Sequence, residues 1–344
     1  MKIIIDAMGG DNAPQAIVQG ALDAHRAHGV DIILVGRTAE VLRAVEACGE
    51  KSLPAGVEIK DAKEVVEIAD DPAMAFKLKP DSSLTVGLNL LRSGAGDAFI
   101  SAGSTGALLS GATLLVKRIR GIRRAAMGPL VPTATGRAVL CDCGANAQCT
   151  AEYLLQFAYL GSFYAQRVCG VERPRVGLLN IGAEEEKGDD LRHEAFGLLQ
   201  EAADQGRIHF IGNVEANEAL MGAADVLVAD GFTGNIMLKT MEGTAKFLLR
   251  ELKKTMTASA KNKLAAGLLK GDLMEMKKLL DPSEVGGTAF LGISRPVIKA
   301  HGSSDARAIA NAVLRAREYA ESGFIADVEA NIEYMRIRTA PEKV

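Results

Sequence analysis

The segment KIIIDAMGGDNAP, residues 2–14, contains the unit from which the chain is built. Its first six residues, KIIIDA, include three consecutive isoleucines, which is typical of a strand buried on both faces. A glycine-containing turn follows. Pro14 then stands where the first turn of a helix would begin, and we predict that this helix runs to about His28. The unit is therefore a short apolar strand, a glycine turn and an amphipathic helix.

The same unit recurs along the chain. Further strands are predicted at residues 31–36, 98–103, 138–145, 175–182, 208–214 and 225–230. Helices are predicted at residues 39–48, 106–116, 150–168, 190–205 and 305–322. Because these strands are continuously apolar and alternate with helices, we expect an α/β protein, a doubly wound α/β/α sandwich with a mostly parallel sheet.

Length and composition set the scale of the molecule. At ~150 residues per domain, 344 residues correspond to about two domains or one large α/β unit. The 48% hydrophobic content is enough for a sizeable core. No low-complexity linker or internal repeat interrupts the sequence. We therefore predict a single α/β domain over residues 1–344 that carries a helical protrusion at residues 246–280.

Charge and hydropathy exclude several functions. The formal net charge is −3, so no overall field attracts nucleic acid, and the absence of Trp removes the best base-stacking side chain. No run of ~18 apolar residues predicts a transmembrane helix. Only three consecutive apolar residues precede Asp6, too few for a signal-peptide core. A cytoplasmic enzyme is the expected class.

The five cysteines do not indicate a disulfide framework or a metal site. Their number is odd, which argues against paired disulfides in a long chain. Cys141, Cys143 and Cys149 are close in sequence, but the C-x-C-x5-C spacing lacks the usual C-x2-C pair and a nearby histidine. We expect small buried thiols and no bound metal.

Loops rich in Gly, Ser, Thr and Asn follow the predicted strands. They are residues 6–14, 101–106, 142–146, 180–188, 230–235, 286–288 and 301–304. In a parallel sheet, ligands bind beyond the carboxyl ends of the strands, and glycine lets backbone N–H groups converge on an anion. Any one such loop is explained by turn and N-cap chemistry alone. Together they favour a phosphate-like ligand.

The better-known nucleotide and hydrolase motifs are absent. The chain has no G-x-x-x-x-G-K-[ST] and no Gly-Lys pair, which argues against a P-loop NTPase. Residues 94–99 have Phe99 in place of the last glycine of the dinucleotide-binding motif G-x-G-x-x-G. They also precede a predicted strand, whereas that motif follows one. The AGSTG segment at residues 102–106 lacks the first glycine of a nucleophile elbow. The His193-Glu194 pair is not continued as H-E-x-x-H.

Six segments in order resemble one family. They are DAMGGDNAP (residues 6–14), SAGSTGA (101–107), DCGAN (142–146), NIGAEEEKG (180–188), ADGFTGNIMLKTMEG (229–243) and HGSS (301–304). The sequence resembles the bacterial fatty acyl-ACP:phosphate acyltransferases. The resemblance implies a Rossmann-like fold related to phosphotransacetylases, a homodimer, no cofactor and peripheral association with the membrane. It also implies that phosphate attacks the thioester of an acyl carrier protein to give acyl phosphate for phospholipid synthesis.

The resemblance also identifies candidate catalytic residues. Because phosphate is itself the nucleophile, the protein must position two reactants and stabilise an oxyanion. Lys187 matches the family's functionally important lysine, and Asn235 is expected to donate an amide hydrogen bond. Without the resemblance, Lys187 would be interpreted as a solvated lysine in an acidic turn.

Other loop residues are expected to bind substrate. They are Asp6, Gly9, Gly10, Asp11, Ser104, Thr105, Gly106, Asp142, Asn146, Asp230, Thr233, Gly234, His301 and Ser303. Several acids around a phosphate would repel it, so the aspartates are expected to orient donors or to brace loops. For His301, a hydrogen bond at the start of a helix is expected. A role as general acid or base in catalysis is less favoured. Which loop holds phosphate and which holds pantetheine is left open.

Residues 246–278 form a basic, amphipathic segment. Nine basic residues face three acidic ones there, a local net charge of +6. A solvated helix pair, a docking surface for the acidic carrier protein and an attachment to anionic lipid are all consistent with this pattern. The family's membrane association favours lipid contact by Leu264, Leu268 and Leu269, flanked by Lys263 and Lys270.

A second basic cluster, residues 117–124, has five basic residues in eight. Capping of a helix C-terminus and contact with the carrier protein or its phosphopantetheine explain it equally well. Direct contact with a downstream membrane acyltransferase is also left open.

Three other functions compete. A phosphotransacetylase acting on short acyl-CoA would share fold and chemistry. An oxidoreductase of the isopropylmalate dehydrogenase fold would need a nicotinamide site and an acidic metal cluster, and neither has a convincing signal. A non-catalytic phosphate- or lipid-binding module would leave Lys187 and Asn235 unexplained.

Overall fold

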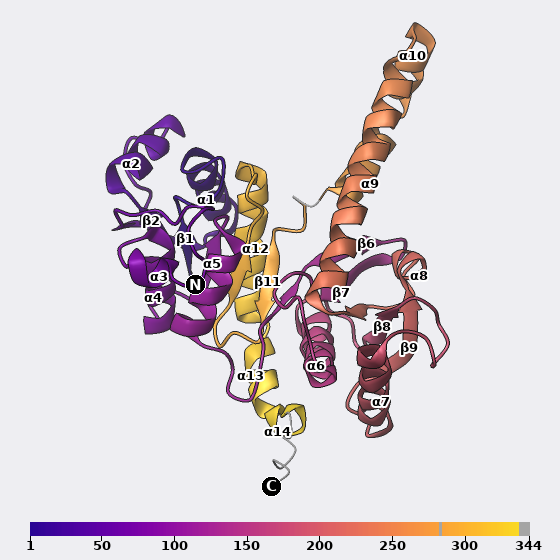
Figure 1. Ribbon diagram of the computed structural model, residues 1–344. Coiled ribbons are helices and arrows are strands. Elements are labelled where there is room, and N and C mark those ends of the chain that lie inside the picture. Colours follow the sequence, from indigo (N-terminus) through magenta and orange to yellow (C-terminus); the bar gives the residue numbers. More distant parts are fainter. Residues whose placement is uncertain (282–283, 337–344) are drawn as a thin grey trace.

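The strands divide between two sheets, each flanked by helices, and Figure 1 shows the two resulting lobes side by side. This computed structural model describes residues 1–281 and 284–336. Most strand pairs are parallel, so the predicted α/β class with mostly parallel sheets is confirmed. The separation into two sheets was not predicted.

The first sheet has seven strands. Their order is β3 (Val57–Asp61), β2 (Asp31–Gly36), β1 (Lys2–Asp6), β4 (Ala98–Ser101), β12 (Val297–Lys299), β11 (Thr288–Leu291) and β5 (Ala126–Gly128). The strands from β3 to β12 are parallel, whereas β11 runs antiparallel to both of its neighbours. In β1, Ile3, Ile4 and Ile5 are all fully buried, because both faces of the sheet are covered.

Helices cover both faces of this sheet. Side chains of Ile3 and Ile5 belong to a core cluster with α1 (Gln15–His28), α2 (Thr38–Ala47) and α12 (Ala306–Glu321). Ile4 belongs to a cluster on the other face with α4 (Ser83–Ser93) and α5 (Thr105–Gly111). Gly20 allows α1 and α12 to pack closely, since a Cβ at this position would lie 2.3 Å from the carbonyl oxygen of Ala306.

The remaining helices around this lobe are short. The structure places α3 at Ala75–Leu78, and α5 continues into a π-helical turn, η1 (Ala112–Val116). The predicted helix at residues 106–116 is thus two consecutive helical segments.

The chain enters the second sheet through a single residue and returns to the first sheet, at β11, after the helices that follow the last strand of the second sheet. Pro129 separates β5, the edge of the first sheet, from β6 (Leu130–Thr133), the edge of the second. The second sheet has the order β6, β7 (Gly136–Cys141), β10 (Val226–Val228), β8 (Arg175–Asn180) and β9 (His209–Glu215). Pro132 is tolerated in β6 because an edge strand leaves half of its backbone groups unpaired.

Helices also cover both faces of the second sheet. One face packs on α6 (Ala151–Arg167) and α7 (Asp190–Asp204), and the other on α8 (Ala216–Leu220) and the start of α9 (Gly231–Thr257). Two short helices, α13 (Phe324–Ala330) and α14 (Ile332–Met335), complete the described chain.

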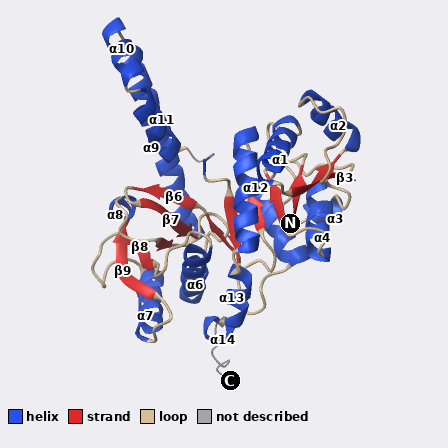
Figure 2. Cartoon of the chain, turned by 180° about the vertical axis from the view of Figure 1, so that it is seen from behind, coloured by secondary structure: helices blue, strands red, loops and turns tan. Residues whose placement is uncertain are grey.

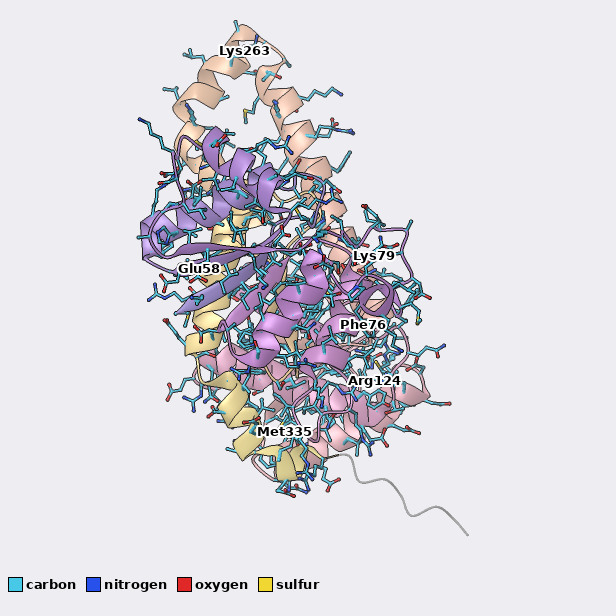
Figure 3. All side chains as sticks on the ribbon, turned by 90° about the vertical axis from the view of Figure 1, so that its left-hand side faces the viewer. Glu58, Phe76, Lys79, Arg124, Lys263 and Met335 are labelled. Atoms are coloured by element: carbon cyan, nitrogen blue, oxygen red, sulfur yellow. The ribbon has the colours of Figure 1, made fainter. Side chains whose placement is uncertain are left out.

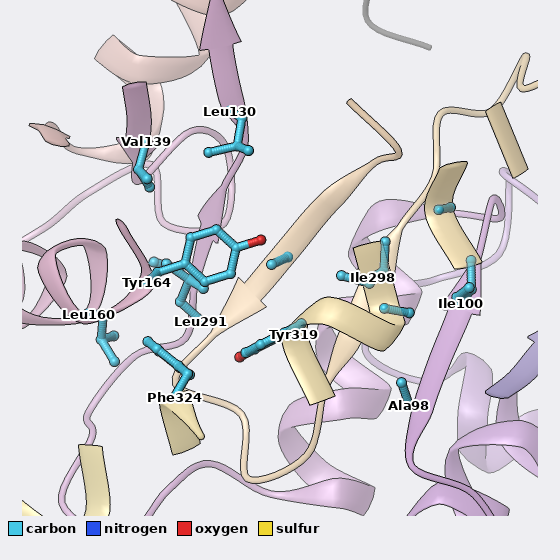
Figure 4. Close-up of a cluster of buried hydrophobic side chains, with 14 of the residues drawn as sticks. Ala98, Ile100, Leu130, Val139, Leu160, Tyr164, Leu291, Ile298, Tyr319 and Phe324 are labelled. Atoms are coloured by element: carbon cyan, nitrogen blue, oxygen red, sulfur yellow. The ribbon is translucent and has the colours of Figure 1, made fainter. Parts of the chain in front are cut away.

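One core cluster joins the two lobes. It contains residues of both sheets, and at its centre Tyr164 of α6 meets Tyr319 of α12 and Phe324 of α13 (Figure 4). The three rings pack edge to face with centroids 5.4–5.9 Å apart. Aromatic pairs of this geometry contribute about 0.5–1.5 kcal/mol beyond the burial of their surface. The prediction of a single domain stays a prediction, and this shared core favours it.

A helical hairpin projects from the second lobe. Figures 1 and 2 show α9 rising away from both sheets to α10 (Ala260–Leu268), from which α11 (Lys270–Leu280) returns. Lys263 lies at the far end in Figure 3. The structure confirms a helical protrusion, but its first helix starts at Gly231, well before residue 246.

Candidate active site

The first group of predicted residues lies at the carboxyl ends of β1 and β4. The buried Asp6 carboxylate accepts hydrogen bonds from Ser101 Oγ at 2.7 Å and from the backbone N–H of Met8 at 3.1 Å. Ser101 Oγ in turn accepts from the Gly103 N–H at 3.0 Å. Burial raises the pKa of Asp6 although these hydrogen bonds oppose the shift. The carboxylate therefore braces two strand-end loops against each other.

The glycines beside Asp6 allow that close approach. A Cβ at Gly9 would lie 2.5 Å from Asp6 Oδ2 and 2.8 Å from the backbone nitrogen of Gly103. Gly10 has φ +101°, a backbone conformation that favours glycine. The next residue, Asp11, donates its N–H to the carbonyl of Gly302 at 2.8 Å, which joins this loop to the HGSS segment.

The HGSS segment precedes α12. His301 Nδ1 lies 2.9 Å from Ser303 Oγ and 3.3 Å from the Ser303 nitrogen. Burial and the nearby charge of Lys239 lower the pKa of His301. Asp305, and not a serine, caps α12 by accepting the N–H of Ala308.

Lys299 is a buried cation that the sequence analysis did not single out. It ends β12 and is only 8% exposed. Its Nζ donates to the carbonyl oxygens of Ala102, at 3.4 Å, and of Ala300. Burial lowers the pKa of Lys299 to about 8, while the charges of Asp6 and Asp11 act in the opposite direction. A lysine at the end of an apolar strand, in VIKA, is the signal that identifies it.

The remaining predicted residues of the first lobe lie at the start of α5. Ser104 caps this helix by accepting the N–H of Ala107 at 3.5 Å, and Thr105 and Gly106 form its first turn. A Cβ at Gly106 would meet the ring of Pro72 at 3.0 Å.

A second group lies beyond the ends of β7 and β10. The fully buried Asp142 carboxylate accepts from the backbone N–H groups of Met127, Cys143, Ala145 and Asn146, and from Asn146 Nδ2. These distances are 2.7–3.3 Å. Burial raises the pKa of Asp142 against the effect of these hydrogen bonds. Without the Asp142 carboxylate these buried donors would be unsatisfied, and each unsatisfied donor would lower the free energy of unfolding by about 1–3 kcal/mol. Asp142 is therefore a structural brace.

The amide of Asn146 extends this brace. Its Nδ2 also donates to the carbonyl of Ala125 at 2.8 Å, and its own carbonyl accepts the Gly231 N–H at 2.8 Å. A Cβ at Gly231 would lie 2.6 Å from the Asn146 carbonyl oxygen, and one at Gly234 only 2.0 Å from the Asp142 carbonyl oxygen. The first turn of α9 therefore packs on the DCGAN loop through two glycines.

Asp230 caps α9. Its carboxylate accepts from the N–H groups of Phe232 and Thr233 and from Thr233 Oγ1, at 2.8–3.0 Å. Arg192 of α7 donates to the same carboxylate and to Thr233 Oγ1. Burial alone would raise the pKa of Asp230, but the bonds from Thr233 and the charge of Arg192 outweigh it and lower that pKa. Arg192 was missed from the sequence, where it is one of many helical arginines.

Lys187 lies on the long loop after β8. Asn180, at the end of β8, donates from Nδ2 to the Lys187 carbonyl at 2.9 Å, which fixes the loop backbone. The Lys187 side chain is exposed, and its stem lies against Gly182. Within residues 1–281 and 284–336, its Nζ has no hydrogen-bond or ion-pair partner.

Asn235 faces the DCGAN loop from the first turns of α9. A Cβ at Gly144 would lie 3.7 Å from Asn235 Oδ1. The Asn235 side-chain amide has no partner among the described residues, so it is available to a ligand. Its helical neighbours at positions i+4 and i+7, Lys239 and Glu242, share its face and form an ion pair at 2.9 Å.

Lys239 connects the two groups electrostatically. Its charge contributes to lowering the pKa of Lys299 and of His301, both of which belong to the first lobe.

The hairpin residues lie away from both groups. Leu264, Leu268 and Leu269, at the outer end, have exposed fractions of 70%, 82% and 44%. Lys263 and Lys270 beside them are exposed as well. Basic residues 117–124 form a loop after η1, in which only Lys117 stands at the helix end.

The cysteines are free thiols. Burial raises the pKa of Cys149 to about 12, and Cys141 and Cys143 are buried and shifted in the same direction. Within the described ranges, no three His, Cys, Asp or Glu side chains are placed to hold a metal ion.

In the same part of the chain, no helix combines the length and apolarity needed to span a bilayer.

Solved structures define the class of fold. A phosphotransacetylase from Streptococcus pyogenes superposes with a TM-score of 0.65 at 17% identity, covering 93% of this chain and 94% of that one. A branched-chain phosphotransacylase from Enterococcus faecalis gives 0.54 at 15% identity, covering 94% and 100%. A Salmonella typhimurium protein assigned as a 4-hydroxythreonine-4-phosphate dehydrogenase also gives 0.54, at 14% identity, covering 92% and 98%. The fold is the α/β fold that phosphotransacetylases share with such dehydrogenases.

Sequence comparison gives the family. Residues 1–327 match the family described as "Fatty acid synthesis protein". The chain is 47% identical to a phosphate acyltransferase of Geobacillus thermodenitrificans, with 97% of this chain and 99% of the relative covered. It is 45% identical to that of Thermoanaerobacter pseudethanolicus, with 97% and 98% covered. The chain belongs to the phosphate acyltransferase family and is an enzyme of that kind.

Proposed function

We propose that this enzyme transfers a long-chain fatty acyl group from an acyl carrier protein to inorganic phosphate, forming acyl phosphate for phospholipid synthesis. The names of its relatives support phosphate as the acceptor, and the family description supports a fatty acyl group. The observation that carries the proposal is the pair Lys187 and Asn235. Both are donors without a partner among the described residues; Lys187 lies on the loop after β8 and Asn235 in the first turns of α9, both in the second lobe.

The reaction needs no protein nucleophile. A phosphate oxygen attacks the thioester carbonyl, the C–S bond of the tetrahedral intermediate breaks, and the thiolate of the carrier leaves. The products are acyl phosphate and the free carrier thiol. Lys187 would neutralise phosphate or the developing oxyanion, and Asn235 would donate an amide hydrogen bond to it.

The aspartates support these donors indirectly. Asp6, Asp142 and Asp230 are engaged with backbone N–H groups, hydroxyls or Arg192, which supports a bracing role for them. Gly9, Gly10 and Gly234 let the loops approach one another, and His301 and Ser303 hydrogen-bond at the start of α12. These residues would shape the substrate site, as would Asp11, Ser104, Thr105, Gly106, Asn146 and Thr233.

We assign the hairpin to an anionic membrane surface, with the carrier protein as the other candidate for its basic sides. Exposed leucines at the tip, flanked by lysines, are the pattern that a lipid interface favours. A cytoplasmic, peripherally membrane-associated homodimer, able to pass its product to a membrane acyltransferase, completes the proposal.

The assay that tests this function mixes the purified protein with phosphate and a donor, and traps acyl phosphate with hydroxylamine. Palmitoyl-ACP, palmitoyl-CoA and acetyl-CoA are compared. We expect hydroxamate from palmitoyl-ACP at the highest kcat/KM. Its absence with every donor would refute the proposal.

Short-chain phosphotransacylation is the second candidate, because the fold is that of a phosphotransacetylase. A clear preference for acetyl-CoA in the same assay would favour it.

A further inference from the structure

A cavity of about 780 Å³ lies beside the first turns of α9. Its walls are the end of β8, the start of α7, the short helix α8 and one face of α9, and they are largely apolar. The apolar contributions come from Leu179, Leu220, Ile236, Met237 and Met241. The volume falls in the range of ~300–1,000 Å³ that is usual for small-molecule sites. The sequence analysis did not predict it, because its lining comes from four separate segments, residues 179–181, 188–192, 216–220 and 233–241.

Polar residues at the end of β8 and the starts of α7 and α9 line one part of the cavity, and Asn217 of α8 and Thr240 of α9 add two polar groups elsewhere. The first part, its polar side, is lined by Asn180, Asp189, Arg192 and Thr233. Arg192 is held in place by its bond to Thr233 Oγ1 at 2.9 Å, so this side is pre-organised. The opposite lining, toward Thr240 and Met241, continues along α9.

Lys187 and Asn235 do not line the cavity themselves, but each directly precedes a residue that does. Asn180 holds the backbone carbonyl of Lys187, and Gly188 next to Lys187 is itself part of the lining. On α9, Asn235 lies directly before Ile236, which also lines the cavity. A ligand whose reacting carbonyl is bound by Lys187 and Asn235 can therefore extend its remaining atoms into the cavity.

We propose that this cavity binds the hydrocarbon chain of the fatty acyl substrate. The inference rests on the proposed function and adds where the chain lies and what limits its length. The thioester would lie at the polar side and the methyl end near Thr240 and Met241. Met237 and Met241 are flexible, polarisable side chains that adapt to apolar ligands of different length.

The first experiment shortens the cavity. Thr240→Phe places a ring at its distal end, whereas Thr244→Phe, one turn further on, adds the same ring at an exposed position outside the lining. Activity is measured by hydroxamate trapping with palmitoyl-ACP and butyryl-ACP. We expect Thr240→Phe to lower kcat/KM for the palmitoyl donor about tenfold or more and to leave the butyryl donor within about twofold, since only the long chain needs the buried apolar contacts. Thr244→Phe should leave both values within about twofold.

The second experiment does not depend on catalysis. The chain contains no Trp, so Ile236→Trp introduces a single fluorophore at an exposed position of the lining. Dibromostearate should quench it saturably, and stearate should compete. Thr244→Trp, the matched control, should show only weak, non-saturating quenching.

The outcomes separate the two proposals. Saturable quenching without acyl phosphate from any donor would refute the proposed function and retain the chain-binding cavity. Acyl phosphate formation with equal quenching of both reporters, or with unchanged chain-length preference in Thr240→Phe, would overturn the cavity assignment. A change of oligomeric state in Thr240→Phe but not in Thr244→Phe would also overturn it, because the cavity would then be a subunit interface.

Discussion

Arg192 of α7 donates a hydrogen bond to Thr233 Oγ1, in the first turn of α9, at 2.9 Å. The same guanidinium pairs with Asp230, which caps α9, and the side chains of Arg192 and Asp230 are only 12% and 7% exposed. This connection fixes the position of the helix that carries Asn235. The candidate site therefore depends on a buried ion pair that contacts no reacting atom in the proposed mechanism.

Removing the guanidinium should destabilise the fold. We expect Arg192→Met to lower the free energy of unfolding by about 3 kcal/mol, because it leaves the Asp230 carboxylate buried without its partner. Urea denaturation measures the change. Arg26→Met is the matched control, since Arg26 pairs with Asp23 and Glu50 at the surface and should cost less than about 1 kcal/mol. Equal losses in both variants would contradict this role of Arg192.

The lowered pKa of Asp230 predicts a pH dependence. The folded state binds the proton of this carboxyl less readily than the unfolded state, whose pKa is about 3.9. The stabilisation by ionised Asp230 is therefore complete above about pH 4 and is lost as pH falls through the folded-state pKa. The difference in unfolding free energy between wild type and Asp230→Asn should shrink below about pH 4. A difference independent of pH would refute this.

Lys299 predicts a pH dependence of the same sign, but at alkaline pH. Its pKa is about 8 when folded and that of an unfolded lysine is about 10.4, so between these values the unfolded chain binds more protons. The free energy of unfolding should therefore rise with pH over this interval. Lys299→Met should lack that rise, and the difference from wild type in urea titrations isolates it. If the free energy of unfolding changes with pH in the same way for wild type and Lys299→Met, the pKa of Lys299 is not lowered in the folded protein.

The two candidate catalytic residues can be tested singly. Lys187→Ala and Asn235→Ala should each lower kcat for acyl-phosphate formation by ~10²–10³, the usual effect of removing one oxyanion donor. Their thermal unfolding should match wild type, because neither side chain has a partner among the described residues. Lys51→Ala, another exposed loop lysine, serves as the control. Near-normal turnover in a folded variant would remove that residue from the mechanism.

Two glycines of α9 should respond in opposite directions to a methyl group. Gly234→Ala would place Cβ 2.0 Å from the Asp142 carbonyl oxygen, so we expect a loss of about 3 kcal/mol or more in stability. Gly243→Ala meets nothing within 4 Å and should gain up to about 1 kcal/mol from helix propensity. Denaturant unfolding of both variants tests the packing of α9 on the DCGAN loop, and a similar effect of both would contradict it.

The hairpin tip can be tested with vesicles. Exchanging Leu264 and Leu268 together for aspartate should reduce flotation with anionic liposomes about tenfold or more, since burying one leucine contributes about 1.5–3 kcal/mol. Ile68→Asp changes an isoleucine that is 83% exposed on the other lobe and should have no effect. Undiminished flotation of the double variant would exclude the tip as the anchor.

Much of the fold could be predicted from local pattern. Continuous apolar runs identified β1, β2, β4, β7, β8, β9 and β10, and α1, α2, α6, α7 and α12 begin and end within two residues of their predicted limits. Predicted strand ends were too late at residues 103 and 145, because small residues continue the apolar composition after the chain leaves the sheet. Short strands such as β5, β11 and β12 were missed. They have three or four residues each, too few for a periodic signal.

The division into two sheets could not be predicted for a different reason. It depends on Pro129, a single residue between two short strands, and on long-range pairings that no local window contains. The loops at the strand ends were recognisable because glycine and small polar residues mark them. Arg192, Lys239 and Lys299 were not, since their importance comes from partners far away in sequence.

The 27 residues of α9 extend over about 40 Å, from the cap at Asp230 toward the exposed leucines. The helix is uninterrupted over this length, so a small rotation at one end becomes a large displacement at the other. A tilt of about 5° at its capped end displaces its other end by about 3.5 Å over that length. If the proposed membrane contact holds the leucines of α10, a change in the angle of α9 would move its first turn, which contains Asn235, relative to the membrane surface.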